Sequence, residues 1–101
     1  MDNLIESVNN NWDNRELLPK ILITISEKQL ELASLIAEAE STYNQAYLAE
    51  KENSYKATDS EIKARAKTLV GSNKTRYEYE FQALSNLLNI IILRISQLDR
   101  L

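Results

Sequence analysis

The side chains in this sequence that could do chemistry are carboxylates, lysines and arginines, because the chain contains neither histidine nor cysteine. Imidazole and thiolate metal ligands and the Ser-His and Cys-His nucleophile pairs are therefore excluded. Glu27 and Glu31 stand four residues apart, with Glu38 and Glu40 nearby, but carboxylate-bridged metal sites in helical bundles pair such glutamates with Glu-x-x-His. We expect no catalytic residue, no metal ion, no cofactor and no enzymatic activity.

The cations gather in the middle of the chain. Residues 51–76 hold seven bases and three acids (7 − 3 = +4), residues 1–50 three bases and nine acids (3 − 9 = −6), and residues 77–101 two bases and three acids (2 − 3 = −1). Lysines and arginines bind phosphates and tyrosine rings stack on bases, so this segment is a candidate for sequence-tolerant binding of single-stranded DNA. The alternative is charge complementarity between antiparallel helices. The cations of this candidate site are Lys51, Lys56, Lys63, Arg65, Lys67, Lys74 and Arg76, with Tyr47, Tyr55, Tyr77 and Tyr79 among or beside them.

The composition favours long helices over a sheet. The 101 residues include one glycine and one proline, too few for the tight turns of an all-β fold. A hydrophobic fraction of 44%, a charged fraction of 27% and a net charge of −3 are typical of an ordered domain. We therefore expect one all-α domain over residues 1–101, either a long helical hairpin or a small helical bundle.

Proline divides the first half of the chain. Pro19 is favoured in the first turn of a helix and restrains the residue before it, so we expect an N-terminal arm or short helix over residues 1–18. The region 19–53 then reads as one amphipathic helix. Its apolar stripe includes Leu22, Ile25, Leu32, Leu35, Ile36, Ala39, Tyr43, Ala46 and Tyr47.

Two local signals divide the second half. Thr58 followed three residues later by Glu61 is a capping box, which predicts a turn at 53–58 and a helix from about Asp59. Gly71 can either end that helix or loosen a continuous one. We therefore expect helices over 59–71 and 73–101, or one kinked helix, and we favour a kink or short break. The first of these helices should point Ile62, Ala66, Leu69 and Val70 inward.

The C-terminal segment carries a heptad-type row. Apolar residues recur at steps of four and three, which keeps them on one face of a helix, at Tyr77, Phe81, Leu84, Leu88, Ile91, Ile95 and Leu98. Ile92 and Leu93 lie off this row, so one turn is apolar all round and needs more neighbours than a chain of three or four helices offers. We expect homo-oligomerisation through this helix; the alternatives are a core helix of a monomeric bundle and a docking face for another protein. The expected interface residues are Leu84, Leu88, Ile91, Ile92, Leu93, Ile95 and Leu98.

A membrane location is not expected. The run of aliphatic residues at 90–93 is far shorter than the roughly 20 residues that span a bilayer, and Arg94 follows it. The acidic first residues lack the basic segment and apolar run of a secretory signal. We expect a cytoplasmic protein.

The stretch from Glu38 to Leu98 resembles a known layout. It reads "EAESTYNQAYLAEKENSYKATDSEIKARAK" and then "YEYEFQALSNLLNIIILRISQL", an Ala/Lys/Tyr helix, a polar turn, a capped Glu/Lys helix and a long apolar helix. This order is similar to that of the small helical early proteins of tailed phages, most nearly the UvsY-type recombination mediators. The resemblance implies a ring-like homo-oligomer that holds single-stranded DNA and helps a recombinase replace the single-strand-binding protein. It would assign DNA contact to Lys51, Lys56, Lys63, Arg65 and Lys67.

Three functions follow as expectations. The first is a non-enzymatic phage-type accessory protein of the recombination-mediator kind, with a recombinase and single-stranded DNA as partners. The second is a phage anti-defence inhibitor, such as an anti-CRISPR protein, that binds and blocks a host nuclease complex. The third is a purely structural assembly module. All three act by binding.

Overall fold

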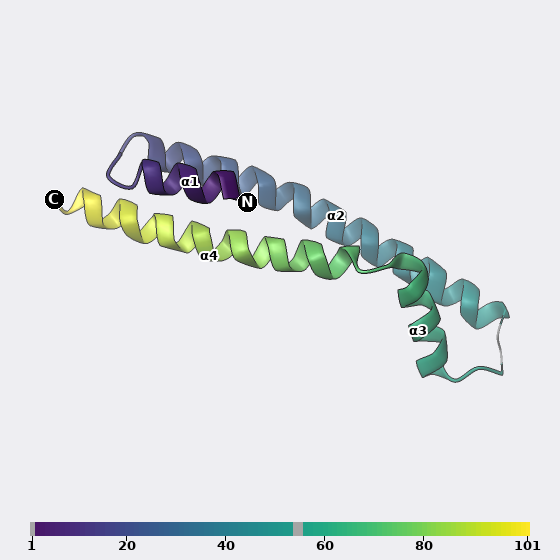
Figure 1. Ribbon diagram of the computed structural model, residues 1–101. Helices are drawn as coiled ribbons and strands as arrows, with labels where there is room; N and C mark the ends of the chain where they lie inside the picture. Colours follow the sequence, from purple (N-terminus) through teal and green to yellow (C-terminus); the bar gives the residue numbers. More distant parts are fainter. Residues whose placement is uncertain (1, 54–55) are drawn as a thin grey trace.

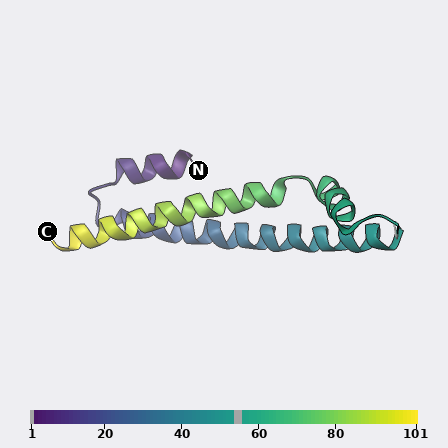
Figure 2. The ribbon, with the colours of Figure 1, turned by 90° about the horizontal axis from the view of Figure 1, so that it is seen from below.

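Four helices form an elongated molecule. The computed structural model describes residues 2–53 and 56–101. Its helices are α1 (Asp2–Asn10), α2 (Leu17–Asn53), α3 (Asp59–Val70) and α4 (Asn73–Asp99). α2 and α4 run antiparallel as a hairpin, α1 lies back against them, and α3 is inclined to both near the turn of the hairpin (Figures 1 and 2). The prediction of an all-α hairpin or bundle is confirmed.

The shape is that of a rod. The molecule measures 67 × 20 × 18 Å and its radius of gyration is 19.7 Å, compared with about 13 Å for a compact domain of 100 residues. An elongated hairpin leaves much of each helix in contact with solvent. Side chains are therefore buried along a line between α2 and α4, and the core does not grow into a thick bundle.

α2 begins two residues earlier than Pro19 predicted. The side-chain oxygen of Asn14 accepts hydrogen bonds from the backbone N–H groups of Glu16 and Leu17, both at 3.1 Å. The N–H of Leu18 donates to the Asn14 carbonyl, also at 3.1 Å. Asn14 thus satisfies N–H groups that a helix start leaves without partners. Pro19 falls within the first helical turn, where its missing N–H costs little.

The predicted start of α3 and the break after it are both present. The Thr58 hydroxyl accepts from the N–H of Glu61 at 3.2 Å, and α3 begins at Asp59. α3 ends at Gly71, which has φ +80° and ψ −164°, a conformation that is essentially restricted to glycine. Its N–H donates to the Lys67 carbonyl at 2.9 Å. The turn expected at 53–58 includes residues 54 and 55, among them Tyr55, which lie outside the described residues.

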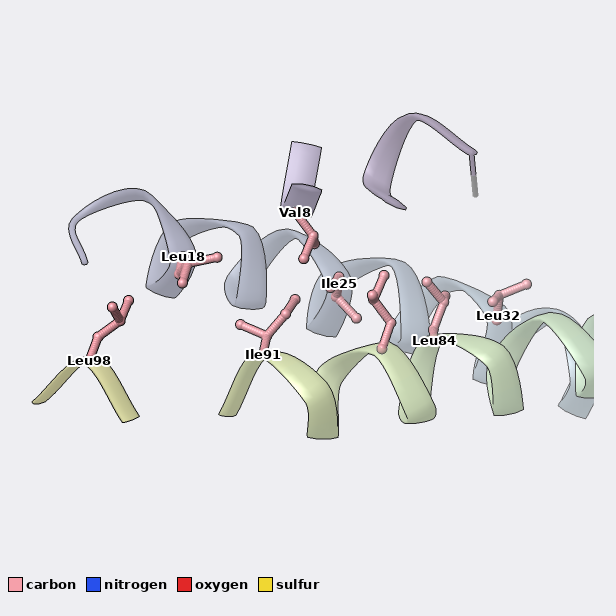
Figure 3. Packing of buried hydrophobic residues seen from close by; sticks show 8 residues of the cluster. Val8, Leu18, Ile25, Leu32, Leu84, Ile91 and Leu98 are labelled. Atoms are coloured by element: carbon pink, nitrogen blue, oxygen red, sulfur yellow. The ribbon is translucent and has the colours of Figure 1, made fainter. Parts of the chain in front are cut away.

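The core consists of two facing rows of aliphatic residues. In each row, the residues are spaced by seven, the heptad repeat that keeps them on one helix face. The rows are Leu18, Ile25 and Leu32 on α2, and Leu84, Ile91 and Leu98 on α4, all at most 4% exposed. Figure 3 shows Leu18 near Leu98 at one end and Leu32 near Leu84 at the other. Burying each such side chain stabilises the fold by about 1.5 to 3 kcal/mol.

Smaller contacts extend this core. Val8 of α1 is 3% exposed and belongs to the same cluster. Ile62 and Ala66 of α3, which packs against α2, are 5% and 0% exposed. The stripe predicted for α2 is confirmed, since every member is buried or half-buried. The prediction that Leu69 points inward is wrong, because its side chain is 68% exposed. The Ile62 and Ala66 side of α3 faces α2, and Leu69 lies on a different side of α3. Among residues 2–53 and 56–101, no helix is both long and apolar enough to cross a bilayer.

Leu84→Ala is expected to destabilise the protein by about 2 to 5 kcal/mol, because it removes buried carbon atoms and leaves a cavity. Leu30→Ala is the matched control, since Leu30 is 73% exposed and its truncation should change stability by no more than about 0.5 kcal/mol. Urea unfolding followed by circular dichroism measures both. Equal losses in the two variants would contradict the buried position of Leu84.

Candidate functional site

The glutamates considered as metal ligands are exposed along α2: Glu27, Glu31, Glu38 and Glu40. Glu31 pairs with Lys28 at 3.6 Å, and Glu40 pairs with Lys74 of α4 at 3.1 Å. Within the parts of the chain that the structure describes, no three carboxylates lie close enough to hold a metal ion. The exposure of all four, and the pairing of Glu31 and Glu40 with lysines, is typical of a solvated helix face.

The basic segment folds back on acidic residues of α2 and of its own helix. Lys63 pairs with Asp59 at 3.0 Å within α3, and Arg65 reaches Glu50 of α2 at 3.8 Å. The end of the rod that contains them, residues 47–70, holds five bases and four acids (5 − 4 = +1). The charge asymmetry of the sequence is therefore largely cancelled in three dimensions, as the alternative of complementary helices proposes.

The structure separates the five candidate DNA-contacting residues. Lys63 and Lys67 lie one turn apart on one side of α3, whereas Arg65 lies with Ala64 and Thr68 beside Glu50 on another side. Lys51 lies over the ring of Tyr47 in α2, with its ammonium 6.0 Å from the ring centre. Lys56 is exposed just before α3.

A strip of lysines and tyrosines runs along one side of the rod. We name it the Lys/Tyr strip and define it by Tyr43, Tyr47, Lys51, Lys63, Lys67 and Lys74. Tyr43, Lys67 and Lys74 line a shared hollow where α2, α3 and α4 meet. Lys74 also pairs with Glu78 at 3.6 Å, and Glu40 raises the pKa of its ammonium. Lys74 is one of the cations of the predicted basic site, although it is not among the five residues that the resemblance assigns to DNA contact.

Asp59 ties α3 to α2. Its carboxylate accepts a hydrogen bond from the Tyr47 hydroxyl at 2.5 Å and pairs with Lys63. The Tyr47 hydrogen bond and the nearby Lys63 hold the pKa of Asp59 below its ordinary value. The same contacts raise the pKa of the Tyr47 phenol and of the Lys63 ammonium. Each shift favours the protonation state in which this cluster is intact.

The expected interface residues divide into two groups. Leu84, Ile91 and Leu98 are buried inside the chain, and Leu88 and Ile95 are half-buried against the same core. Their assignment to an interface is corrected, because α2 already covers this side of α4. Ile92 and Leu93 are 46% and 64% exposed. They are the members of the set that a partner could contact.

Two arginines attach the α1–α2 connection to α4, which the sequence reasoning missed. Arg94 donates from Nε to the Trp12 carbonyl at 2.9 Å, lies 5.1 Å from the centre of the Trp12 ring, and forms an ion pair with Asp13. Arg15 donates to the carbonyl of Leu98 at the end of α4. More than 80 residues separate these partners in sequence. The only signal was an arginine directly after the aliphatic run.

Comparison of the chain with protein-family models, with curated proteins and with solved structures yields no match. The resemblance to recombination mediators therefore remains a prediction from the residue pattern.

Tyr47→Phe is expected to raise the pKa of Asp59 toward its ordinary value, because it removes the hydrogen bond that lowers this pKa most. Since the pKa of Asp59 is lowered and that of Tyr47 is raised, the contact is fully stabilising between about pH 4 and pH 10 and weakens beyond either limit. NMR titration of the Asp59 carboxyl measures the change. Tyr43→Phe is the matched control and should leave this titration unaltered; an unchanged Asp59 pKa in Tyr47→Phe would refute the assigned role.

Proposed function

We propose that this protein is a non-enzymatic accessory protein that acts by assembling with copies of itself and by binding another macromolecule. The observation that carries the proposal is the exposed aliphatic surface of α4. Ile90, Ile92 and Leu93 lie within four positions of this helix and are 47%, 46% and 64% exposed. Exposed apolar surface of this kind is typical of contact sites between proteins.

Size supports the same proposal. A chain of this length buries a modest share of its surface, and association supplies burial that the single chain lacks. In the rod, α2 covers the inner side of α4 and α1 covers a short part of another side (Figure 1). Association along the uncovered length of α4 would bury side chains that the chain itself leaves in solvent.

Self-assembly predicts a molar mass of at least twice 11.6 kDa, the mass of one chain. Light scattering coupled to size-exclusion chromatography measures this mass without assuming a shape, which matters for a rod. A dilution series from about 100 μM downward should show the mass falling toward one chain as the complex dissociates. A mass of 11.6 kDa at every concentration would reject self-assembly.

A second candidate function is contact with single-stranded DNA, as the resemblance to recombination mediators implies. The Lys/Tyr strip favours it, because it combines ammonium groups for phosphates with aromatic rings for bases. The carboxylates of Asp59, Glu40 and Glu78 pair with Lys63 and Lys74 in this strip. They offset part of its charge, so we rank DNA contact below self-assembly.

If the strip holds DNA, replacing both Lys63 and Lys67 with Ala lowers the affinity for a fluorescent oligothymidine and makes its salt dependence shallower. The logarithmic slope should fall by about 1.4, or 0.7 for each lost phosphate contact. The matched control replaces Lys20 and Lys28, which lie at the other end of α2, and should have little effect. Fluorescence anisotropy at several salt concentrations measures both. Absence of wild-type binding at low salt would reject DNA contact and leave self-assembly standing.

A further inference from the structure

α4 carries a second row of residues at heptad spacing, on the side that α2 does not cover. Steps of 4, 3, 4, 3 and 4 join Tyr79, Ala83, Asn86, Ile90, Leu93 and Gln97, which we name the outer seam. Tyr79 is 75% exposed, Leu93 is 64% exposed and Ile90 is 47% exposed. Side chains spaced in this way lie in one line along a helix, so a second helix can pack against all of them at once.

The middle of the outer seam, from Ala83 to Leu93, lies on a part of α4 that carries no charge. Residues 81–93 contain no Asp, Glu, Lys or Arg, although 27% of the whole chain is charged and a stretch of 13 would hold about 3.5 such residues (0.27 × 13). Beside it, Ile90 and Leu87 of α4 form an open apolar hollow with Ile5 and Trp12. Arg94 lies next to this stretch, where it pairs with Asp13 and donates a hydrogen bond to the side-chain oxygen of Gln97 at 3.2 Å. Residues 81–93 themselves offer no charge with which to select an acidic or a basic partner.

We propose that the outer seam is the contact between two copies of this chain, α4 packing against the α4 of the second copy. The inference rests on the self-assembly proposed above and identifies its surface. In a two-fold contact, residues near the symmetry axis meet their own counterparts. Amide side chains suit such a position, because each donates and accepts hydrogen bonds. Asn86 and Gln97 are the two amide side chains of the outer seam. The Gln82 side-chain amide donates a hydrogen bond to the side-chain oxygen of Asn86 at 3.2 Å.

The outer seam matches a second copy in either orientation of the two α4 helices. Parallel pairing places Asn86 opposite Asn86 and Leu93 opposite Leu93. Antiparallel pairing about the midpoint between residues 91 and 92 places Asn86 opposite Gln97 and Ile90 opposite Leu93. In both arrangements amide meets amide and aliphatic meets aliphatic, which favours a second copy because a buried amide facing an aliphatic side chain is costly.

The outer side of α2 is a poorer surface for a second copy. Ile23 and Leu30 are 59% and 73% exposed there, but Glu27 stands between them in sequence and Glu31 follows directly. A two-fold contact on this side would bring the carboxylates of the two copies together, and like charges placed in this way oppose association. The uncharged outer seam carries no such penalty.

The available area fits a dimer of ordinary size. At about 1.5 Å per residue, the 27 residues of α4 span about 40 Å, and the molecule is 20 Å wide. The side formed by α4 with α1 next to it thus offers about 800 Å², the area that each partner contributes to a standard interface.

Leu93→Glu tests the surface, with Leu30→Glu as the matched control on α2. Leu93→Glu should raise the dimer dissociation constant at least tenfold, because it places two carboxylates at the contact, and Leu30→Glu should leave it within about twofold. Sedimentation equilibrium measures the constants. Circular dichroism of each variant confirms that the helices are retained.

The outcomes separate this inference from the proposed function. If the wild type self-associates and Leu30→Glu abolishes association while Leu93→Glu does not, the outer seam is rejected and self-assembly stands. If the wild type is monomeric, self-assembly itself is rejected. If the wild type is monomeric and binds another protein through Leu93, the outer seam is the binding surface for that protein and the assignment to a second copy fails.

Cysteines report the orientation, and the chain has none of its own. In a parallel dimer, Asn86→Cys alone brings two thiols within reach of a disulfide, whereas in an antiparallel dimer Asn86→Cys together with Gln97→Cys does so. Mild oxidation should therefore convert most of one of these two variants to a covalent dimer. Leu30→Cys is the control and should remain largely uncoupled at the same concentration. Dimeric variants of which neither cross-links would overturn the outer seam.

Discussion

The register between α2 and α4 is the constraint on which the rest of the structure depends. Three pairs of buried residues obey it, since the residue numbers of Leu18 with Leu98, Ile25 with Ile91 and Leu32 with Leu84 each sum to 116. The hydrogen bond from Gln29 to Ser85, at 2.7 Å, and the ion pair of Glu40 with Lys74 keep nearly the same offset. This one alignment therefore decides which side of α4 α2 covers and which side stays in solvent. It also fixes the point along α2 at which α3 ends and α4 begins.

The same alignment brings residues of opposite charge together. The sequence places its acids first and its bases in the middle, and the hairpin brings the two together at one end of the rod. Cations of α3 and α4 then meet Glu50 and Glu40 of α2, while Asp59 binds both Tyr47 and Lys63. The ion pairs at this end connect α3 and α4 to α2 and offset part of the positive charge of the Lys/Tyr strip.

Much of the fold could be predicted from sequence, because its signals are local. The capping box at Thr58, the helix break at Gly71 and the heptad row of α4 each depend on neighbouring residues only. α2 begins two residues before the predicted start, because Asn14 caps the helix ahead of Pro19. Which residues of α4 face a partner could not be predicted, because periodicity identifies a buried side but does not tell whether the same chain covers it. The contacts of Arg94 were missed because its partners, Trp12 and Asp13, are distant in sequence.

The rod shape has a consequence for how such a chain can change in length. Its core is a line of repeated layers, so the stability of the hairpin grows with the number of layers and the cross-section stays constant, as in quasi-one-dimensional repeat proteins. Seven residues could be gained or lost in α2 together with seven in α4, and every remaining layer would keep its partner. Three residues added to one helix alone would turn all the following side chains away from theirs. In this architecture, length varies in paired heptads, and sequences of different lengths can share one packing rule.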